Sequence, residues 1–175
     1  MTERIIIAGA GGQGVMLLGK ILATAAMAEN KFTTCLPAYG AEVRGGTAYC
    51  MVVVSDEEIG WPYIDLADTL IIMNAPSLQK FKARVKPKGL VLVNSSLVGE
   101  TGTKKAIRFP FTGIAAQLGN IKVANMVALG SYLKQKEIIA PKTILRVIQE
   151  SAPPDKKDLI AVNQEALKKG MRLEA

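Results

Sequence analysis

The chain of 175 residues is 49% hydrophobic and 21% charged with few aromatics, which suits one globular domain, 1–175, with an aliphatic core. Its formal net charge is +7, and it contains two cysteines and no histidine. These counts exclude a Cys₄ iron–sulfur cluster, a zinc centre of the usual Cys/His type and a histidine-dependent catalytic triad within this chain alone.

Hydrophobic periodicity predicts strands and helices in alternation. In chain order we first expect a strand over Arg4–Ala8, a helix over Val15–Glu29 that stops at Asn30, a strand over Phe32–Leu36, a loop over Pro37–Gly46 and a strand over Thr47–Ser55. The second part continues with a strand over Thr69–Met73, a helix over Pro76–Arg84, strands over Gly89–Asn94 and Ala106–Phe109, and helices over Thr112–Leu118, Ala124–Gln135, Pro141–Glu150 and Asp155–Met171.

This alternation predicts an α/β fold, a three-layer αβα sandwich that is Rossmann-like. The Thr47–Ser55 strand follows its predecessor through a loop without a helix, so we expect it to run antiparallel. The predicted sheet is therefore mixed and mostly parallel.

A glycine-rich turn follows the first strand. Gly9, Gly11 and Gly14 match the pattern G-x-G-x-x-G between a strand and a helix. Such glycines permit a tight turn, and the helix N-terminus then offers free N–H groups and a partial positive charge to a phosphate. The alternative is that the glycines only allow the helix to lie close to the sheet.

The surrounding residues argue against a dinucleotide at this turn. A Rossmann domain places an acidic residue at the end of the second strand to bind ribose hydroxyls, but here that strand ends in Leu36-Pro37. Glu29 has the sequence offset from the glycine turn that a ribose-binding acid would have, but it belongs to the end of the predicted helix and not to the second strand.

The densest basic run lacks the interleaved aromatics of a nucleic-acid stacking platform. It comprises Lys80, Lys82, Arg84, Lys86 and Lys88. We interpret it as a solvated face with cations near a helix C-terminus, with an acidic protein partner as the alternative and no nucleic acid. The start of the chain lacks the features of a signal peptide, and no apolar run suits a membrane span, so we expect no membrane partner and a cytoplasmic location.

Cys35 and Cys50 have no metal-ligand spacing. Both lie in apolar, strand-like stretches, which predicts buried free thiols. We expect no catalytic residue and no metal ligand on this chain alone.

Three segments together resemble the gamma subunit of 2-oxoacid:ferredoxin oxidoreductases. They are Gly9-Ala10-Gly11-Gly12-Gln13-Gly14-Val15, Tyr39-Gly40-Ala41-Glu42-Val43-Arg44-Gly45-Gly46-Thr47-Ala48 and Gly119-Asn120-Ile121-Lys122-Val123-Ala124-Asn125-Met126-Val127-Ala128-Leu129-Gly130. The resemblance extends to the closing Asn163-x-x-Ala166-x-x-x-Gly170. The stretches Ser55–Ile59 and Met73–Ser77 are most similar to the 2-oxoglutarate branch.

The resemblance implies a subunit that is inactive alone. Its complex would decarboxylate a 2-oxoacid on thiamine diphosphate with magnesium, pass electrons through iron–sulfur clusters to ferredoxin, and transfer the acyl group to coenzyme A. The cofactors would be held by the alpha, beta and ferredoxin-like delta subunits, so this chain would bind none of them alone. A chain without these partners is expected to expose apolar surface, which is compatible with a homodimer.

Within this resemblance, the candidate residues that face the active centre or a cofactor fall in three groups. They are the turn residues Gly9, Gly11, Gly12, Gln13 and Gly14, the loop residues Arg44, Gly45 and Gly46, and the amides Asn74, Asn94 and Asn125. Arg44 has a planar fork suited to a carboxylate or phosphate, with an ion pair to Glu42 as the alternative. For the three asparagines the alternative is capping of a loop or helix.

Two other functions stay open at this point. The chain could serve a complex for pyruvate, branched-chain 2-oxoacids or indolepyruvate, or it could be a stand-alone nucleotide-binding regulatory module.

Overall fold

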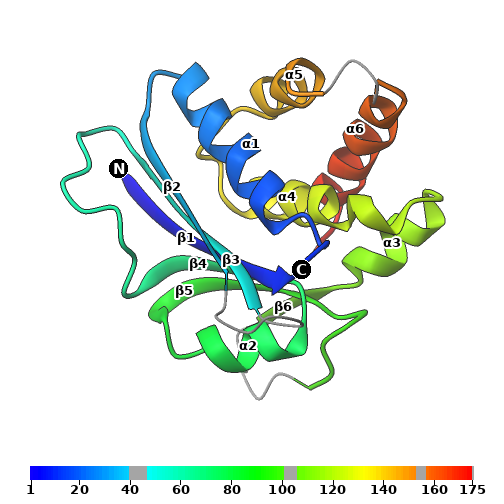
Figure 1. Ribbon diagram of the computed structural model, residues 1–175, viewed down its shortest axis with the longest axis horizontal. Helices are drawn as coiled ribbons and strands as arrows, with labels where there is room; N and C mark the ends of the chain where they lie inside the picture. The colour runs from blue at the N-terminus through cyan, green and yellow to red at the C-terminus, as the bar shows by residue number, and fades with distance from the viewer. Residues whose placement is uncertain (40–46, 101–105, 153–156, 175) are drawn as a thin grey trace.

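The computed structural model describes residues 1–39, 47–100, 106–152 and 157–174 (Figure 1). The strands are β1 (Thr2–Ala10), β2 (Phe32–Tyr39), β3 (Thr47–Ser55), β4 (Ala67–Ile72), β5 (Val85–Asn94) and β6 (Ala106–Phe109). The helices are α1 (Val15–Ala28), α2 (Ala75–Phe81), α3 (Phe111–Gln117), the 3₁₀ helix η1 (Ile121–Val123), α4 (Ala124–Gln135), α5 (Pro141–Glu150) and α6 (Asp158–Met171).

The six strands form one mixed sheet in the order β2-β3-β1-β4-β5-β6. Strand β3 pairs antiparallel with both β1 and β2, whereas the pairings of β1 with β4, β4 with β5 and β5 with β6 are parallel. In β1, Ile7 is paired with Cys50 of β3 on one side and with Ile71 of β4 on the other. The predicted antiparallel strand and the mostly parallel sheet are therefore confirmed.

Helices cover both faces of the sheet, but unequally (Figure 1). One face carries α1 and α4, with α5 and α6 stacked beyond them, and its core includes Leu18, Leu129 and Tyr132. The other face carries α2, and its smaller core includes Phe81 and Leu70. The αβα arrangement is thus confirmed, with the larger hydrophobic core on the α1 side.

Two glycines allow α4 and α6 to cross at very short range. A Cβ at Gly170 would lie 2.9 Å from the backbone nitrogen of Ser131 and closer still to the carbonyl oxygen of Val127. A Cβ added at Gly130 would likewise come too close to the backbone carbonyl of Leu167 in α6. Each helix therefore contacts the backbone of the other, and no other residue type fits at either position without moving a helix.

Strands β1, β2 and β5 are longer than the sequence predicts, and β1 covers Thr2–Ala10 rather than Arg4–Ala8. Strand β2 continues through Pro37 to Tyr39, so the predicted loop start at Pro37 is wrong. Because β2 is an edge strand of the sheet, a residue without an N–H group is tolerated there. Strand β5 begins at Val85 rather than Gly89, and its register with β4 shifts between the pairs Ala67–Val85 and Thr69–Leu90.

Helix ends also differ slightly from the prediction. Helix α2 ends at Phe81, because the following residues turn directly into β5. Helix α6 is observed from Asp158, and the predicted start at Asp155 lies outside the described residues. Asn30 adopts a left-handed backbone conformation with a φ of 58°, which confirms it as the stop signal after α1.

The basic run is partly used by the fold itself. The Lys80 amine lies 5.1 Å from the ring centre of Tyr49. Arg84 donates hydrogen bonds to the backbone carbonyls of Ile64 and Asp65 in the loop before β4, and Lys86 pairs with the carboxylate of Asp68. Lys80, Lys82 and Lys88 are exposed, and Lys80 lies in the last turn of α2, as a solvated face with cations near a helix C-terminus requires. Arg84 and Lys86 are in addition bound to neighbouring groups, and the exclusion of nucleic acid stays a prediction. In the described ranges, no helix has an apolar stretch long enough to cross a bilayer.

Candidate functional site at the carboxyl edge of the sheet

Three predicted site segments meet at one edge of the sheet. The parallel strands β1, β4 and β5 end there, and they are followed by the glycine turn, by Asn74 and by the loop after Asn94 respectively. Open α/β sheets bind ligands outside the carboxyl ends of their parallel strands. The fold therefore brings the turn and two of the three amides to the expected edge.

Gln13 shapes the glycine turn from the inside. Its side-chain oxygen accepts a hydrogen bond from the N–H of Ala10 at 2.7 Å, and its side-chain nitrogen donates to the Met73 carbonyl at 3.4 Å. Its own N–H donates to the Ala10 carbonyl at 3.2 Å. The expectation that the Gln13 N–H faces a phosphate is therefore wrong, because that group is used to close the turn.

The four glycines of the turn have different roles. A Cβ at Gly9 would lie 2.9 Å from the Cβ of Met73, so this glycine is required by packing. Gly12 and Gly14 have φ angles of 85° and 70°, a region that favours glycine. At the exposed Gly11 the φ angle is not positive, and no described atom lies within 4 Å of the point that a Cβ would occupy, so neither reason applies.

The turn presents free hydrogen-bond donors next to a helix N-terminus. Within the described part of the chain, the N–H groups of Gly11, Gly12, Gly14 and Val15 donate to no acceptor. Helix α1 has no side-chain cap and no acidic residue in its first turn, so its positive end is not neutralised locally. These features are the ones that helix N-termini use when they bind anions.

A shallow pocket of about 320 Å³ lies against the turn. Besides the turn it is lined by Leu17 of α1, Tyr39 at the end of β2 and Ala48 of β3. Tyr39 is 73% exposed. Neither Tyr39 nor Leu17 was predicted as a site residue. Tyr39 begins the second of the three family segments, and Leu17 lies one helical turn after Gly14, so both positions carried a signal in the sequence.

Asn125 fastens the turn to helix α4. Its side-chain nitrogen donates to the Gly14 carbonyl at 3.1 Å, and its oxygen accepts the N–H of Met126 at 2.9 Å. A Cβ at Gly14 would lie 2.7 Å from the Cγ of Asn125, so the close approach requires a glycine there. The predicted cap is wrong in position, because Val123 is the N-cap of α4 and Asn125 lies within the helix.

The other two amides also hold the edge together. The Oδ1 atom of Asn74 accepts the N–H of Ser77 at 3.1 Å and so caps α2, which is the alternative considered for this residue. Asn94 is fully buried, and its Nδ2 donates to the Met73 carbonyl at 3.1 Å and to Thr112 at 2.9 Å. The Met73 carbonyl thus accepts bonds from both Gln13 and Asn94, and the edge of the sheet is a connected amide network.

The predicted loop residues Arg44, Gly45 and Gly46 lie outside the described residues. The residues on either side of this loop are next to the glycine turn, since Thr47 pairs with Ala10 and Tyr39 pairs with Ala48.

Glu29 is committed to the fold. It caps the C-terminus of α1, and its carboxylate accepts the N–H of Ala140 at 2.9 Å. It is therefore not placed to bind a ribose, as the sequence argument against a dinucleotide expects.

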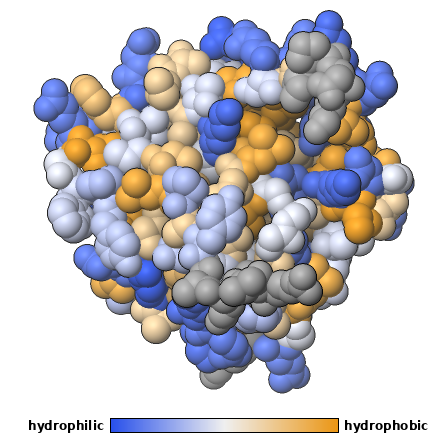
Figure 2. Space-filling view, in the orientation of Figure 1, coloured by the Kyte–Doolittle hydropathy of each residue, from blue (hydrophilic) through white to orange (hydrophobic). Residues whose placement is uncertain are grey.

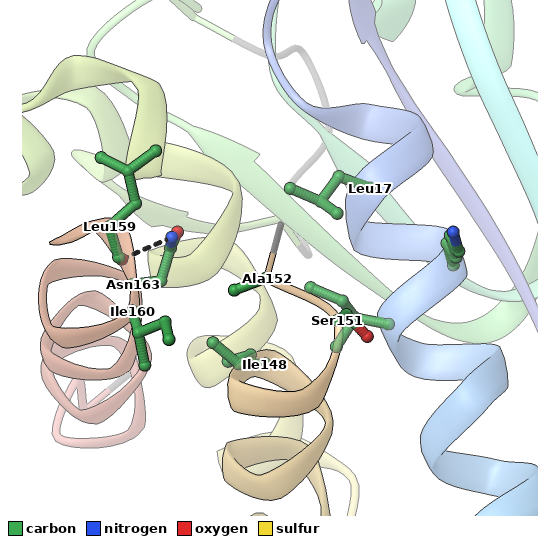
Figure 3. Close-up of a pocket in the computed structure, with 9 residues that line it drawn as sticks. Leu17, Ile148, Ser151, Ala152, Leu159, Ile160 and Asn163 are labelled. Carbon is green, nitrogen blue, oxygen red and sulfur yellow. Dashed lines mark hydrogen bonds between the residues drawn. The ribbon is translucent and has the colours of Figure 1, made fainter. Parts of the chain in front are cut away.

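A second pocket, of about 410 Å³, lies where α1, α5 and α6 meet (Figure 3). Figure 2 shows apolar surface gathered in this part of the molecule. Leu17, Ile148, Leu159 and Ile160 line the pocket, and Lys20 is the one charged side chain among the lining residues that the structure describes. Asn163 of the closing motif donates to the Leu159 carbonyl at 2.7 Å. The pocket offers apolar contact but no acid–base pair.

The described ranges contain no group of three His, Cys, Asp or Glu residues that could hold a metal ion. Among the described residues, the groups that the turn offers to a ligand are backbone N–H donors, which suit an anion.

Comparison with protein families gives a match over nearly the whole chain. The family model described as Pyruvate ferredoxin/flavodoxin oxidoreductase matches residues 4–173. The chain belongs to this family.

Relatives within the oxidoreductase family differ in length and in named substrate. The chain is 43% identical over 128 residues to the ketoisovalerate oxidoreductase subunit VorA of Methanothermobacter thermautotrophicus, covering 73% of this chain and 27% of that protein. It is 33% identical over 172 residues to the 2-oxoglutarate synthase subunit KorC of Methanocaldococcus jannaschii, covering 94% of this chain and 92% of that protein. The chain thus spans about a quarter of the VorA relatives but 76–98% of the KorC relatives.

Solved structures of the family share the fold. The gamma subunit of a keto/oxoacid ferredoxin oxidoreductase from Geobacter sulfurreducens superposes with a TM-score of 0.83 at 28% identity, covering 96% of this chain and 95% of that one. A 2-oxoglutarate:ferredoxin oxidoreductase from Magnetococcus marinus gives a TM-score of 0.86 at 23% identity, covering 97% of this chain and 30% of that one. The predicted resemblance to the gamma subunit is confirmed, while the 2-oxoglutarate branch is not decided between the KorC and VorA relatives.

Proposed function

We propose that this chain is the gamma subunit of a multi-subunit complex that oxidatively decarboxylates a 2-oxoacid to its acyl-CoA and passes the electrons to ferredoxin. We further propose 2-oxoglutarate as the substrate. The support is that KorC subunits match over almost their whole length, as this chain would if it were the corresponding subunit. The higher identity to part of VorA favours a branched-chain 2-oxoacid as the second candidate.

The observation that carries the proposed role is the glycine turn with its free donors. The amide network fixes the backbone around the turn, yet the N–H groups of Gly11, Gly12 and Gly14 have no described acceptor. A phosphate would accept several such bonds at the positive end of α1. We propose that this phosphate belongs to coenzyme A, which the Magnetococcus enzyme is described as binding.

Gly11 fits this role because nothing in the described part of the fold requires a glycine at this position. Gly11 has open space around it and no positive φ, so an alanine would fit the fold there. In the proposed site, however, its Cβ would stand between the backbone and a bound anion. In the proposed site Arg44 adds a fixed cation, supplied by the loop whose flanking residues Tyr39 and Thr47 lie beside the turn.

The chain's own residues bind and orient the acyl acceptor, and they carry out no bond-breaking step. Thiamine diphosphate with magnesium would supply the decarboxylation chemistry, and iron–sulfur clusters the electron transfer, on the alpha, beta and ferredoxin-like delta subunits. The two cysteines of this chain contact each other at 3.3 Å, and two thiolates do not complete a Cys₄ cluster.

Exposed aromatic side chains support a role within an assembly. Trp61 is 71% exposed and Tyr39 is 73% exposed, and aromatic residues of this kind are enriched at protein interfaces. In VorA the matching segment is one part of a longer chain, so the corresponding domain there is attached to other protein. A homodimer of the isolated chain and a cytoplasmic location stay predictions.

Co-expression with the genes encoded beside it tests the assembly. We expect the chain to co-purify with a thiamine diphosphate-binding subunit and a cluster-binding subunit. The complex should reduce ferredoxin with 2-oxoglutarate and coenzyme A faster than with ketoisovalerate. Isolation of the chain without a stable partner, together with saturable binding of NAD or ATP, would instead establish the stand-alone nucleotide-binding module.

The Gly11→Ala variant tests the anion site in that complex. We expect the KM for coenzyme A to rise about tenfold, which corresponds to about 1.4 kcal/mol and to the loss of about one charge-assisted hydrogen bond. Gly60→Ala is the matched control, because Gly60 also has open space around it but lies far from the turn in sequence. Equal KM values for both variants would remove the turn from the proposed site.

A further inference from the structure

The two cysteines form a contact that the proposed function does not use. Cys35 lies on the edge strand β2 and Cys50 on the neighbouring strand β3, and their sulfur atoms are 3.3 Å apart. Both thiols are free. In the β2–β3 register Cys35 faces Val52 and Cys50 faces Pro37, so the two cysteines are diagonal neighbours on the same face of the sheet.

The surroundings direct the two thiols toward each other. Cys50 is fully buried. A Cβ added at Gly19 of α1 would lie 2.6 Å from the Cys50 sulfur, so this helix packs directly against the thiol. Cys35 is only half-buried on the edge strand. Cys35 is thus the more exposed residue of the pair, and Cys50 is enclosed between β3 and α1.

We propose that Cys35 and Cys50 form a redox-active dithiol that a hydroperoxide oxidises to an intramolecular disulfide between β2 and β3. A disulfide requires the sulfur atoms to move from 3.3 Å to about 2.05 Å and the Cβ atoms to lie about 3.5–4.5 Å apart. Diagonal neighbours are typically up to about 7–8 Å apart, so the edge strand β2 must also shift locally toward β3, without exchange of strand partners.

The chemistry has two balanced steps. The Cys35 thiolate attacks one oxygen of the peroxide, the O–O bond breaks, and the products are a sulfenic acid on Cys35 and hydroxide. The Cys50 sulfur then attacks the Cys35 sulfur, the S–O bond breaks, and water leaves with the Cys50 proton. With hydrogen peroxide, the two thiols together lose two electrons, and the hydroxide takes up the proton that Cys35 released on ionising, so the products are two molecules of water. An organic hydroperoxide gives one alcohol and one water instead. A thiol such as dithiothreitol reverses the bond by exchange.

The electrostatics of the pair supports this division of roles. The hydrogen bond from Cys50 lowers the pKa of Cys35 to about 7, although partial burial opposes the effect. The same hydrogen bond, burial and the negative charge on Cys35 raise the pKa of Cys50 well above its usual range. Cys35 is therefore the nucleophile and Cys50 keeps the proton, until conversion of Cys35 to a neutral sulfenic acid removes that charge.

The location of the pair connects it to the anion site. Cys35 is four residues before Tyr39, the last residue of β2, which lines the pocket against the glycine turn. A disulfide would tie the edge strand that leads to this pocket covalently to β3.

Peroxide titration of the reduced, full chain tests the proposal. We expect a monomer lighter by two hydrogens, no thiol left for iodoacetamide, a Cys35–Cys50 linked peptide after digestion, and full recovery of both thiols with dithiothreitol. A sulfinic or sulfonic acid on Cys35, or a disulfide between two chains, would overturn it.

Two variants separate the roles of the thiols. In Cys50→Ala, the sulfenic acid on Cys35 has no resolving thiol and should be trapped by dimedone. In Cys35→Ser, a conservative change on the half-buried edge position, Cys50 should stay reduced at the same peroxide dose. This second variant remains informative if Cys50→Ala does not fold, and oxidation of Cys50 in it at the wild-type rate would contradict the assigned order.

Discussion

Replacing Gly170 by alanine adds one methyl group where α6 crosses α4, and the structure predicts the sign and size of its effect. The new Cβ would lie 2.9 Å from the Ser131 nitrogen and nearer to the Val127 carbonyl oxygen. Relaxed contacts between such atoms lie at about 3.5–4.0 Å, so the helices would have to separate by about 1 Å. The obstructing atoms are backbone, which cannot rotate away as a side chain can.

The two opposing contributions can be compared. Overpacking of a close contact costs about 1–3 kcal/mol. Alanine is favoured over glycine inside a helix by about 1 kcal/mol. Because the clash is with backbone, we expect the upper part of the packing range and a net loss of about 2 kcal/mol. For a chain of this size that corresponds to a fall in Tm of about 4–8 °C.

Thermal and urea denaturation followed by circular dichroism would measure the change. Gly113→Ala is the matched control, since Gly113 is also helical but a Cβ there would meet its nearest atom, on Ser96, at 3.4 Å. It should be neutral or stabilising by up to about 1 kcal/mol. The reasoning is refuted if Gly170→Ala is as stable as the wild type. Combining it with Gly130→Ala should cost less than the sum, because the helices need to separate only once.

Three further predictions concern polar contacts. Asn94→Ala should lower the free energy of unfolding by about 1–3 kcal/mol, because the Met73 carbonyl keeps only its longer bond from Gln13 and the partly buried Thr112 N–H loses its acceptor. Lys136→Ala should cost about 1–3 kcal/mol in urea denaturation, because the nearly buried carboxylate of Glu3 loses its ion pair at 3.3 Å. Hydrogen bonds from Lys31 and the terminal amine lower the pKa of Asp56 to about 2, below its usual 3.8, so this pairing stabilises the fold above about pH 4 and is lost as the pH falls toward 2. Asp56→Asn should therefore flatten the dependence of Tm on pH in this acid range.

Each of these predictions has a clear contrary result. Asn94→Ala with unchanged stability would mean that water satisfies both groups. A double variant with Glu3→Gln should recover part of the loss in Lys136→Ala, and no recovery would exclude an uncompensated charge as the cause. An unchanged acid-range slope in Asp56→Asn would show that other carboxylates account for it.

Buried strands with simple patterns were predictable from the sequence. The strand Thr47–Ser55 and its antiparallel direction are as expected, because the missing helix before it leaves a hairpin as the short connection. The extension of β2 through Pro37 was not predictable, since it depends on β2 being an edge strand. The start of β5 was missed because its first residues are basic and include Pro87 and Gly89, which locally favour a turn.

The candidate site was predictable as a location rather than as a set of ligand contacts. The turn motif and the strand ends placed Gly11 and Asn94 at the correct edge. The sequence could not show that Gln13 and Asn125 turn inward, because their partners, Met73 and Gly14, are distant in the sequence and adjacent only in the fold. For the same reason, contact between the two cysteines follows from strand register and not from their spacing.

The bond from Asn125 to Gly14 joins residues 111 positions apart. During synthesis the first strand and helix leave the ribosome well before α4 exists, so the glycine turn cannot reach its final form until most of the chain has been made. A fragment that ends before α4 would retain every residue of the glycine motif but lack the tether that fixes it. The proposed anion site would therefore be completed late in folding, when α4 packs against the N-terminal turn.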